Sequence, residues 1–173
     1  MNLIVTCPRY FESETKDEMR GILEEMGDKS PEIVESGLSG ILTVKTDVEP
    51  IKVPKKIREK IQNEPWTIRY LLRVIPIQRW ITTEIEEIIS ESQKLAEIIE
   101  EDEKYRITIE KRNSNLSSRE IISKLADRIN RKVALDDPTW TVLVEIIGGK
   151  TGLAVLAKND VLSVEKEKRS LSE

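Results

Sequence analysis

The sequence predicts an α+β fold built from two consecutive units. Its first half alternates short apolar segments with amphipathic ones, in the order β-α-β-β-α-β. That order is typical of a ferredoxin-like sandwich, in which helices cover one face of a sheet. The second half instead begins with a long acidic amphipathic segment and closes with two apolar strands around a glycine pair. These two patterns predict one sheet and its helices in each half.

The elements of the first unit follow from the spacing of their apolar residues. Strands are expected over residues 3–7, 32–36, 40–45 and 67–75. Helices are expected over residues 13–26 and 53–63, because apolar side chains recur there every three or four positions. Gly27 is expected to end the first helix, and Pro54 to lie at the start of the second.

The second unit is expected to begin with a helix over residues 83–101, followed by a strand over 105–111 and a helix over 118–131. A hairpin of strands 140–147 and 153–157 then closes the unit. We expect residues 1–80 to form the N-terminal ferredoxin-like domain, residues 81–164 a second domain, and residues 165–173 a charged flexible tail.

The hairpin contains Gly-Gly-Lys-Thr, which is also the ending of a nucleotide-binding P-loop. The first glycine of a P-loop would fall at Val144, inside an apolar run, and no helix signal follows Thr151. We therefore interpret Gly148 and Gly149 as a tight turn between two strands.

The composition excludes several classes of catalytic site. The 173 residues include no histidine and a single cysteine, Cys7, so Ser-His-Asp and Cys-His centres, disulfides and multi-cysteine zinc sites are ruled out. Cys7 ends an apolar segment and is expected to be a small core residue. No apolar run approaches bilayer length and no signal-peptide pattern is present. We expect a cytoplasmic protein with no cofactor, no metal and no membrane partner.

Two features allow both a structural and a functional interpretation. The glutamates of residues 83–101 could serve acid–base chemistry or bind a metal, but they fall opposite the isoleucine stripe, which favours a solvated face. Trp66, Trp80 and Trp140 could stack on nucleobases, although single tryptophans beside strands are more typical of packing anchors.

Cationic side chains are concentrated in two segments, although the formal net charge is −4. Lys124, Arg128 and Arg131 recur at helical spacing in the segment 104–132. A second segment, "IRYLLRVIPIQRW", places arginines among apolar and aromatic residues. Such clusters are typical of phosphate binding, but a charge-rich surface also produces them by chance. Charge alone leaves both interpretations open.

Residues 81–164 resemble a THUMP domain, the RNA-binding module of thiouridine synthases, RNA methylases and pseudouridine synthases. The resemblance rests on "YRITIEKRNS", "SSREIISKLADRINRKVALDDP" and "TWTVLVEIIGGKTGLAVL", in that order. It implies a THUMP α/β unit after the ferredoxin-like one, RNA contacts through Lys111 and Arg112, and a turn shaped by Asp136 and Pro138.

The whole chain is similar to stand-alone members of this family that assist an RNA cytidine acetyltransferase in making N4-acetylcytidine on tRNA; "RYLLRVIPI" is part of the likeness. The resemblance implies a non-catalytic tRNA-binding protein that presents tRNA to a separate modifying enzyme. The expected partners are tRNA and an RNA cytidine acetyltransferase or another tRNA-modifying enzyme. Catalytic members carry a further domain, for which 173 residues are expected to leave no room.

We predict no catalytic residues and an RNA-binding site made of Lys111, Arg112, Lys124, Arg128, Arg131, Lys132, Arg69, Arg73 and Arg79. Two alternatives remain open. One is an RNA-modifying enzyme acting through carboxylates or lysine, or a subunit of another system such as thiolation or methylation. The other is a protein-interaction module that uses the acidic helix.

Overall fold

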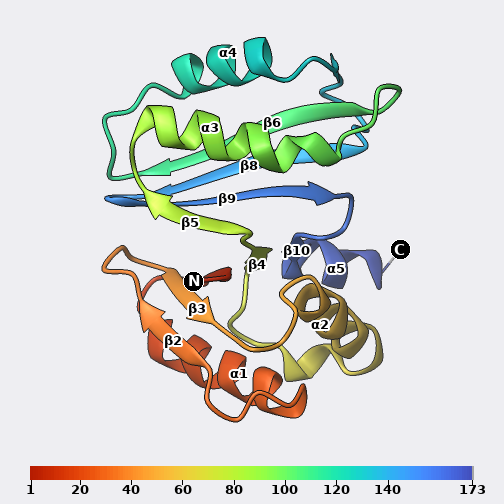
Figure 1. The fold of residues 1–173 in the computed structure, drawn as a ribbon. Helices are drawn as coiled ribbons and strands as arrows, with labels where there is room; N and C mark the ends of the chain where they lie inside the picture. Colours follow the sequence, from red (N-terminus) through yellow and green to blue (C-terminus); the bar gives the residue numbers. More distant parts are fainter. Residues whose placement is uncertain (173) are drawn as a thin grey trace. The chain divides into compact units, whose positions relative to one another are not determined.

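The computed structural model describes residues 1–172, which divide into two compact units (Figure 1). Unit 1 contains Met1–Ile77 and the segment that begins at Asn159. Unit 2 contains Gln78–Lys158. The chain thus builds most of unit 1, continues through unit 2 and then returns to unit 1.

Unit 1 is built on an antiparallel sheet of five short strands. They are β1 (Leu3–Thr6), β2 (Glu32–Glu35), β3 (Ile41–Lys45), β4 (Arg73–Pro76) and β10 (Leu162–Ser163). Their spatial order is β10-β4-β1-β3-β2. The first four strands, with helices after β1 and β3, match the predicted ferredoxin-like unit.

Helices α1 (Glu12–Glu25) and α2 (Lys52–Asn63) bury their apolar faces against this sheet, where Met19 and Ile57 are fully buried. The strand predicted over residues 67–75 is shorter than expected, because β4 begins only at Arg73. Residues Pro65–Thr67 form a 3-10 turn, η1. The carboxylate of Glu18 accepts hydrogen bonds from the backbone N–H groups of Arg69 and Tyr70 at 2.6 and 2.7 Å, so these groups do not pair with a neighbouring strand.

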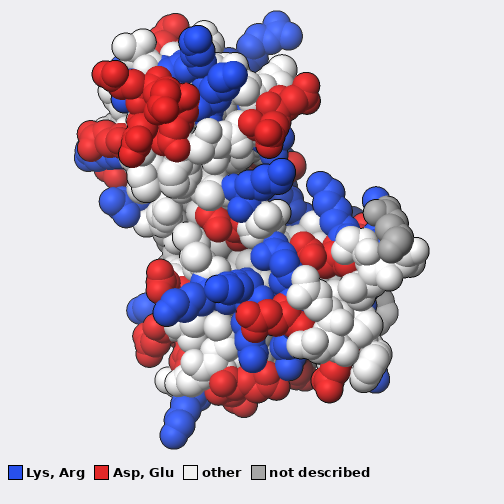
Figure 2. All heavy atoms as spheres, turned by 90° about the vertical axis from the view of Figure 1, so that its right-hand side faces the viewer, with Lys and Arg blue, Asp and Glu red and all other residues white. Residues whose placement is uncertain are grey.

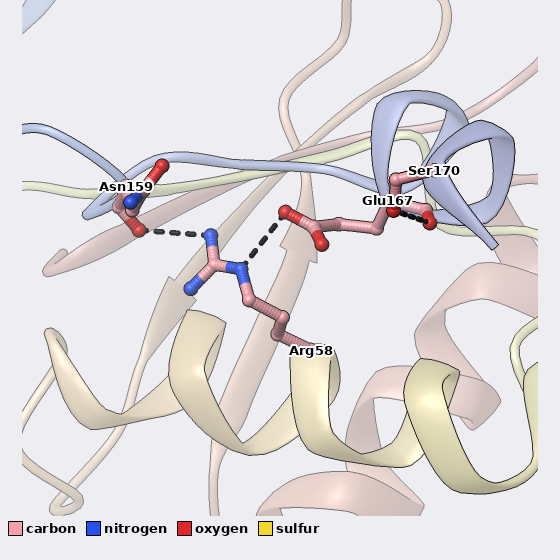
Figure 3. A network of polar contacts seen from close by, with 4 residues as sticks. All are labelled: Arg58, Asn159, Glu167 and Ser170. Atoms are coloured by element: carbon pink, nitrogen blue, oxygen red, sulfur yellow. Dashed lines mark hydrogen bonds and ion pairs between the residues drawn. The ribbon is translucent and has the colours of Figure 1, made fainter. Parts of the chain in front are cut away.

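The C-terminal segment is not the flexible tail that the sequence suggested. Residues Val164–Ser170 form helix α5. The Arg58 side chain on α2 donates from Nε to Glu167 at 2.8 Å and from a terminal nitrogen to the Asn159 carbonyl at 2.9 Å (Figure 3). Val164 is buried in the core of unit 1, and these contacts together hold α5 on that unit.

Unit 2 is a mixed sheet with helices on one face. Its strands are β5 (Arg79–Thr82), β6 (Lys104–Arg112), β7 (Lys132–Val133), β8 (Trp140–Ile147) and β9 (Lys150–Ala157). They lie in the order β5-β9-β8-β6-β7, with β6 parallel to both β7 and β8. Helices α3 (Ile85–Leu95) and α4 (Ser118–Arg128) contribute to the core with Tyr105, Val142 and Val144.

Both helices of unit 2 end earlier than the sequence suggested. Helix α3 stops at Leu95 and is followed by a 3-10 turn, η2 (Ala96–Ile98). Helix α4 stops at Arg128, because Ile129 adopts an extended conformation that buries its side chain. The glutamates on α3 are exposed or half-exposed, whereas Ile88 and Ile89 are buried, as expected for a solvated acidic face.

The glycine pair forms the turn that its sequence predicts. Ile147 pairs with Lys150 in the β8–β9 hairpin, so Gly148 and Gly149 are the two residues that connect the strands. Gly148 has a φ of +58°, a left-handed conformation that glycine adopts without steric cost. The interpretation as a hairpin turn is confirmed.

Candidate nucleic-acid interface

The nine predicted RNA-binding residues do not form a single cluster. Arg69 and Arg73 belong to unit 1, where Arg69 is exposed and Arg73 is half-buried on β4. The other seven belong to unit 2: Arg79, Lys111, Arg112, Lys124, Arg128, Arg131 and Lys132. The residues of unit 2 are themselves separated along strand β6.

Strand β6 places cations at both of its ends. Lys132 on β7 pairs in register with Lys104, the first residue of β6. Lys111 and Arg112 lie at the other end, beside the hairpin turn. With a rise of about 3.3 Å per residue, Lys104 and Lys111 are separated by roughly 23 Å. The structure therefore has a β6-start group and a β6-end group: the first is Lys104, Arg128, Arg131 and Lys132, and the second is Lys111, Arg112, Arg119 and Lys150.

In the β6-end group, internal contacts already engage two side chains. A terminal nitrogen of Arg112 lies 2.9 Å from the carboxylate of Glu145, whose side chain is fully buried. The Lys111 ammonium donates to the Leu116 carbonyl at 2.7 Å. Arg119 and Lys150 are exposed and form no ion pair within residues 1–172. Arg112 thus compensates a carboxylate, whereas the three exposed cations Lys111, Arg119 and Lys150 have no carboxylate partner within residues 1–172.

Lys124, at the middle of α4, is compensated by two carboxylates. Its ammonium lies 3.4 Å from Glu86 on α3 and 3.4 Å from Glu120 one turn earlier. The hydrogen bond to Glu86, followed by the one to Glu120, raises the pKa of Lys124. Arg79 is similarly placed, with its Nε 3.6 Å from Glu91. Neither cation is free to neutralise a phosphate without giving up a carboxylate partner.

The β6-start group keeps its positive charge. Lys104, Arg128 and Lys132 are exposed and form no side-chain hydrogen bond or ion pair in the described part of the chain. Arg131 donates only to the carbonyl groups of Ile99 and Asn130, so no carboxylate compensates its charge. Among the predicted residues of unit 2, Arg128, Arg131 and Lys132 thus carry a charge that no carboxylate within residues 1–172 compensates, as does Lys111 at the other end of β6.

Acidic side chains lie close to this group. The turn before Lys104 contains Glu100, Glu101, Asp102 and Glu103. On the face drawn in Figure 2, acidic side chains (red) gather in patches next to basic ones (blue). Binding to such a surface depends on where each phosphate falls, and not on one broad positive field.

The predicted packing roles of the tryptophans and of Cys7 can be compared with their burial in the structure. Trp140 is half-buried against the core and donates from its indole nitrogen to Glu103 at 3.0 Å, as a packing anchor does. Trp66 is 67% exposed, so the interpretation as an anchor is wrong there. Cys7 is buried as predicted, and burial raises the pKa of its thiol.

Sequence reasoning missed a pocket of about 490 Å³ in unit 2. It is lined by Arg106, Asp137, Pro138, Thr141 and Lys158. No local pattern joins residues so distant along the chain, and the pairing of three strands brings them together. Over the described residues, no helix is both long and apolar enough to cross a bilayer, and no three metal-ligating side chains are grouped.

Comparison with known proteins found one family model that matches part of unit 2. Residues 82–156 match the family model of the THUMP domain. An uncharacterized protein of Methanocaldococcus jannaschii is 25% identical over the whole of this chain, which covers 46% of that protein. The chain thus spans about half the length of the curated relative that it matches.

Solved structures share the fold at low sequence identity. A protein of Pyrococcus horikoshii, PH1313, is similar with a TM-score of 0.67 and 19% identity, over 90% of this chain and 54% of that one. TrmN from Thermus thermophilus has a TM-score of 0.57 and 13% identity, over 88% of this chain and 44% of that one. A 4-thiouridine synthetase solved with RNA and ATP has a TM-score of 0.55 and 12% identity, over 94% of this chain and 42% of that one. At these identities the likenesses show a shared α/β fold.

Proposed function

We propose that this chain, which carries a THUMP domain in residues 82–156, is a non-catalytic tRNA-binding protein that presents tRNA to a separate modifying enzyme. The observation that carries the proposal is the position of uncompensated cations on that domain. Lys104, Arg128 and Lys132 are exposed at one end of β6, and Arg119 and Lys150 at the other, without a carboxylate partner in residues 1–172.

The spacing of the two groups suits a folded RNA. The roughly 23 Å between them spans several successive nucleotides of an RNA helix. A rigid strand holds them apart, so both can contact phosphates only where the RNA has the matching shape. Such contacts supply affinity and orientation but read little sequence, as is usual for the recognition of RNA helices.

The reaction that we assign to the partner is the formation of N4-acetylcytidine on tRNA, by an RNA cytidine acetyltransferase. The support is the similarity of the whole chain to the stand-alone THUMP proteins that assist this reaction. The sequence also has no histidine, and its single thiol is buried with a raised pKa, so the commonest nucleophile–base pairs are missing from this chain. A cytoplasmic location belongs to the same proposal.

A second candidate is that the chain works as part of an RNA-modifying enzyme, in thiolation or methylation. One observation favours it: the chain covers only 46% of the curated relative and 40–54% of similar solved structures. Those similar structures include TrmN and a 4-thiouridine synthetase. This chain would then correspond to the RNA-binding half of such a protein.

Reconstitution separates the two candidates. The purified chain is incubated with tRNA and acetyl-CoA, with and without the acetyltransferase of the same source, and nucleosides are analysed by mass spectrometry. We expect N4-acetylcytidine only when both proteins are present. Product formed by the chain alone, or modification only with S-adenosylmethionine or a sulfur donor, would contradict the adaptor. No retention of tRNA by the chain on a filter would contradict RNA binding itself.

A further inference from the structure

The pocket that sequence reasoning missed, here called the Arg106 pocket, is built by strand register. Tyr105 and Val142 point into the core of unit 2. Because side chains alternate along a strand, Arg106 and Thr141 point to the opposite face, and they are direct cross-strand partners on β6 and β8. Lys158 follows the last residue of β9 and also lines the pocket. Three neighbouring strands thus bring two cations and a hydroxyl together.

A short loop forms the remaining wall and is held in place by backbone hydrogen bonds. The Ala134 N–H donates to the Tyr105 carbonyl, and the Thr139 N–H donates to the Lys104 carbonyl, both at 2.9 Å. These bonds fix both ends of the loop on β6, at the two residues that immediately precede Arg106. Within the loop, Asp137 adopts a left-handed φ of +50° and Pro138 follows it. The wall is therefore preorganised and pays little ordering entropy on binding.

The donors in the pocket are only lightly engaged. The Arg106 guanidinium makes one hydrogen bond, a long one of 3.5 Å to the Leu135 carbonyl, which leaves most of its five N–H donors available. The Lys158 ammonium lies 3.6 Å from Asp137, and both side chains are largely exposed, at 76% and 85%. Exposed pairs of this kind are weak and exchange readily. With Arg106 and Lys158 against Asp137, the lining carries a net positive charge.

We propose that the Arg106 pocket binds a phosphate group of the RNA, an inference that rests on the proposed function and adds a defined subsite to it. Arg106 donates two N–H groups to the phosphate oxygens, since its planar fork matches their spacing. Lys158 leaves Asp137 to supply a second charge, and the Thr141 hydroxyl donates from the floor of the pocket. Leu135, which is 75% exposed in the same loop, offers an apolar contact for the attached ribose or base.

The central test compares two double variants for tRNA affinity across a salt series. Arg106→Gln with Lys158→Gln removes the pocket cations. Lys29→Gln with Lys55→Gln removes two exposed, unpaired lysines of unit 1 as a matched control. At about 0.1 M salt we expect the pocket variant to lose about eightfold in affinity and about 0.9 in the salt slope, the value of one phosphate contact, and the control to change by less than about twofold. Equal behaviour of the two variants would overturn the inference.

A second variant, which keeps both Arg106 and Lys158, tests the pocket even if the double variant does not fold. Asp137→Asn releases Lys158 and removes a negative charge from the pocket, so we expect tRNA affinity to rise by about threefold or more. Asp17→Asn removes the same charge from an exposed position on α1 of unit 1, and we expect a smaller gain. A gain that is absent, or equal in the two variants, would contradict a phosphate at the pocket.

A free nucleotide also carries a phosphate group, so a second experiment distinguishes a free nucleotide from an RNA as the source of the bound phosphate. The wild-type chain is titrated with AMP while the amide resonances of Thr141 and Lys158 are followed by NMR. We expect the same resonances to shift with a short RNA at much lower concentration than with AMP. Saturable AMP binding together with full tRNA affinity of the pocket variant would reject the RNA phosphate. If the wild-type chain does not bind tRNA at all, the proposed function itself is rejected.

Discussion

The sharpest prediction concerns which cations of α4 and its surroundings bind RNA. Helical spacing alone makes Lys124 and Arg128 equivalent, but the structure distinguishes them. Lys124 faces Glu86 and Glu120 at 3.4 Å, whereas Arg128 and Lys132 have no carboxylate partner in the described chain. We therefore compare Arg128→Gln with Lys132→Gln, as a double variant, against Lys124→Gln.

The magnitude follows from the number of phosphate contacts. Each contact contributes about 0.9 to the slope of log affinity against log salt. At about 0.1 M salt one contact therefore corresponds to roughly eightfold in affinity, and two contacts to roughly 60-fold, with a slope lower by about 1.8. Lys124 acts through a locally compensated charge, so its removal should change affinity by about threefold or less.

Filter binding of labelled tRNA at five or more salt concentrations measures both quantities, and thermal melting by circular dichroism confirms that each variant is folded. An equal loss of affinity in Lys124→Gln and in the double variant would contradict this difference between the cations. A double variant that keeps the affinity and the salt slope of the wild-type chain would contradict phosphate binding by Arg128 and Lys132.

Two further predictions concern the stability of unit 1. Gly40→Ala should lower the free energy of unfolding by about 2 kcal/mol or more, because φ at Gly40 is +76° and a Cβ there would lie 2.6 Å from the Cys7 carbonyl oxygen. Gly21→Ala should instead raise the free energy of unfolding by about 0.5–1 kcal/mol, because Gly21 lies in helix α1 and a Cβ there meets nothing within 4 Å. Urea titration of both variants measures the two free energies. Asp28 is buried, and the hydrogen bond from the Thr46 hydroxyl lowers the pKa of the Asp28 carboxyl. The ionised carboxylate therefore stabilises the fold fully above the ordinary pKa of aspartate, and this stabilisation is lost as pH falls through the lowered pKa of the folded state. Asp28→Asn should cost about 1–2 kcal/mol at neutral pH and flatten this acid limb of the stability curve, and an unchanged limb would contradict the assignment.

The elements that the sequence predicted well are those with long, regular patterns. The β-α-β-β-α-β order, the apolar faces of the helices and the two-glycine hairpin are encoded within a few residues of chain. The missed elements are short or depend on distant partners: β7 and β10 have two residues each. Helix α5 has few apolar residues, and its place depends on an ion pair between Arg58 and Glu167, which are 109 positions apart.

The candidate site was harder to predict than the fold, because the state of a charge depends on tertiary contacts. Lys124 and Glu86 are 38 positions apart, and Arg112 and Glu145 are 33 apart, so no local pattern reveals that these cations are compensated. The division of the cations between the two ends of β6 likewise follows from the pairing of Lys104 with Lys132 on a neighbouring strand.

The site of tRNA binding can be located by ultraviolet cross-linking of tRNA to the full chain, with the attached peptides identified by mass spectrometry. We predict that cross-links concentrate in unit 2, in the peptides that contain residues 104–106 and 128–138. Cross-links confined to unit 1, or to the acidic face of α3, would contradict the assignment of tRNA binding to these cations of unit 2.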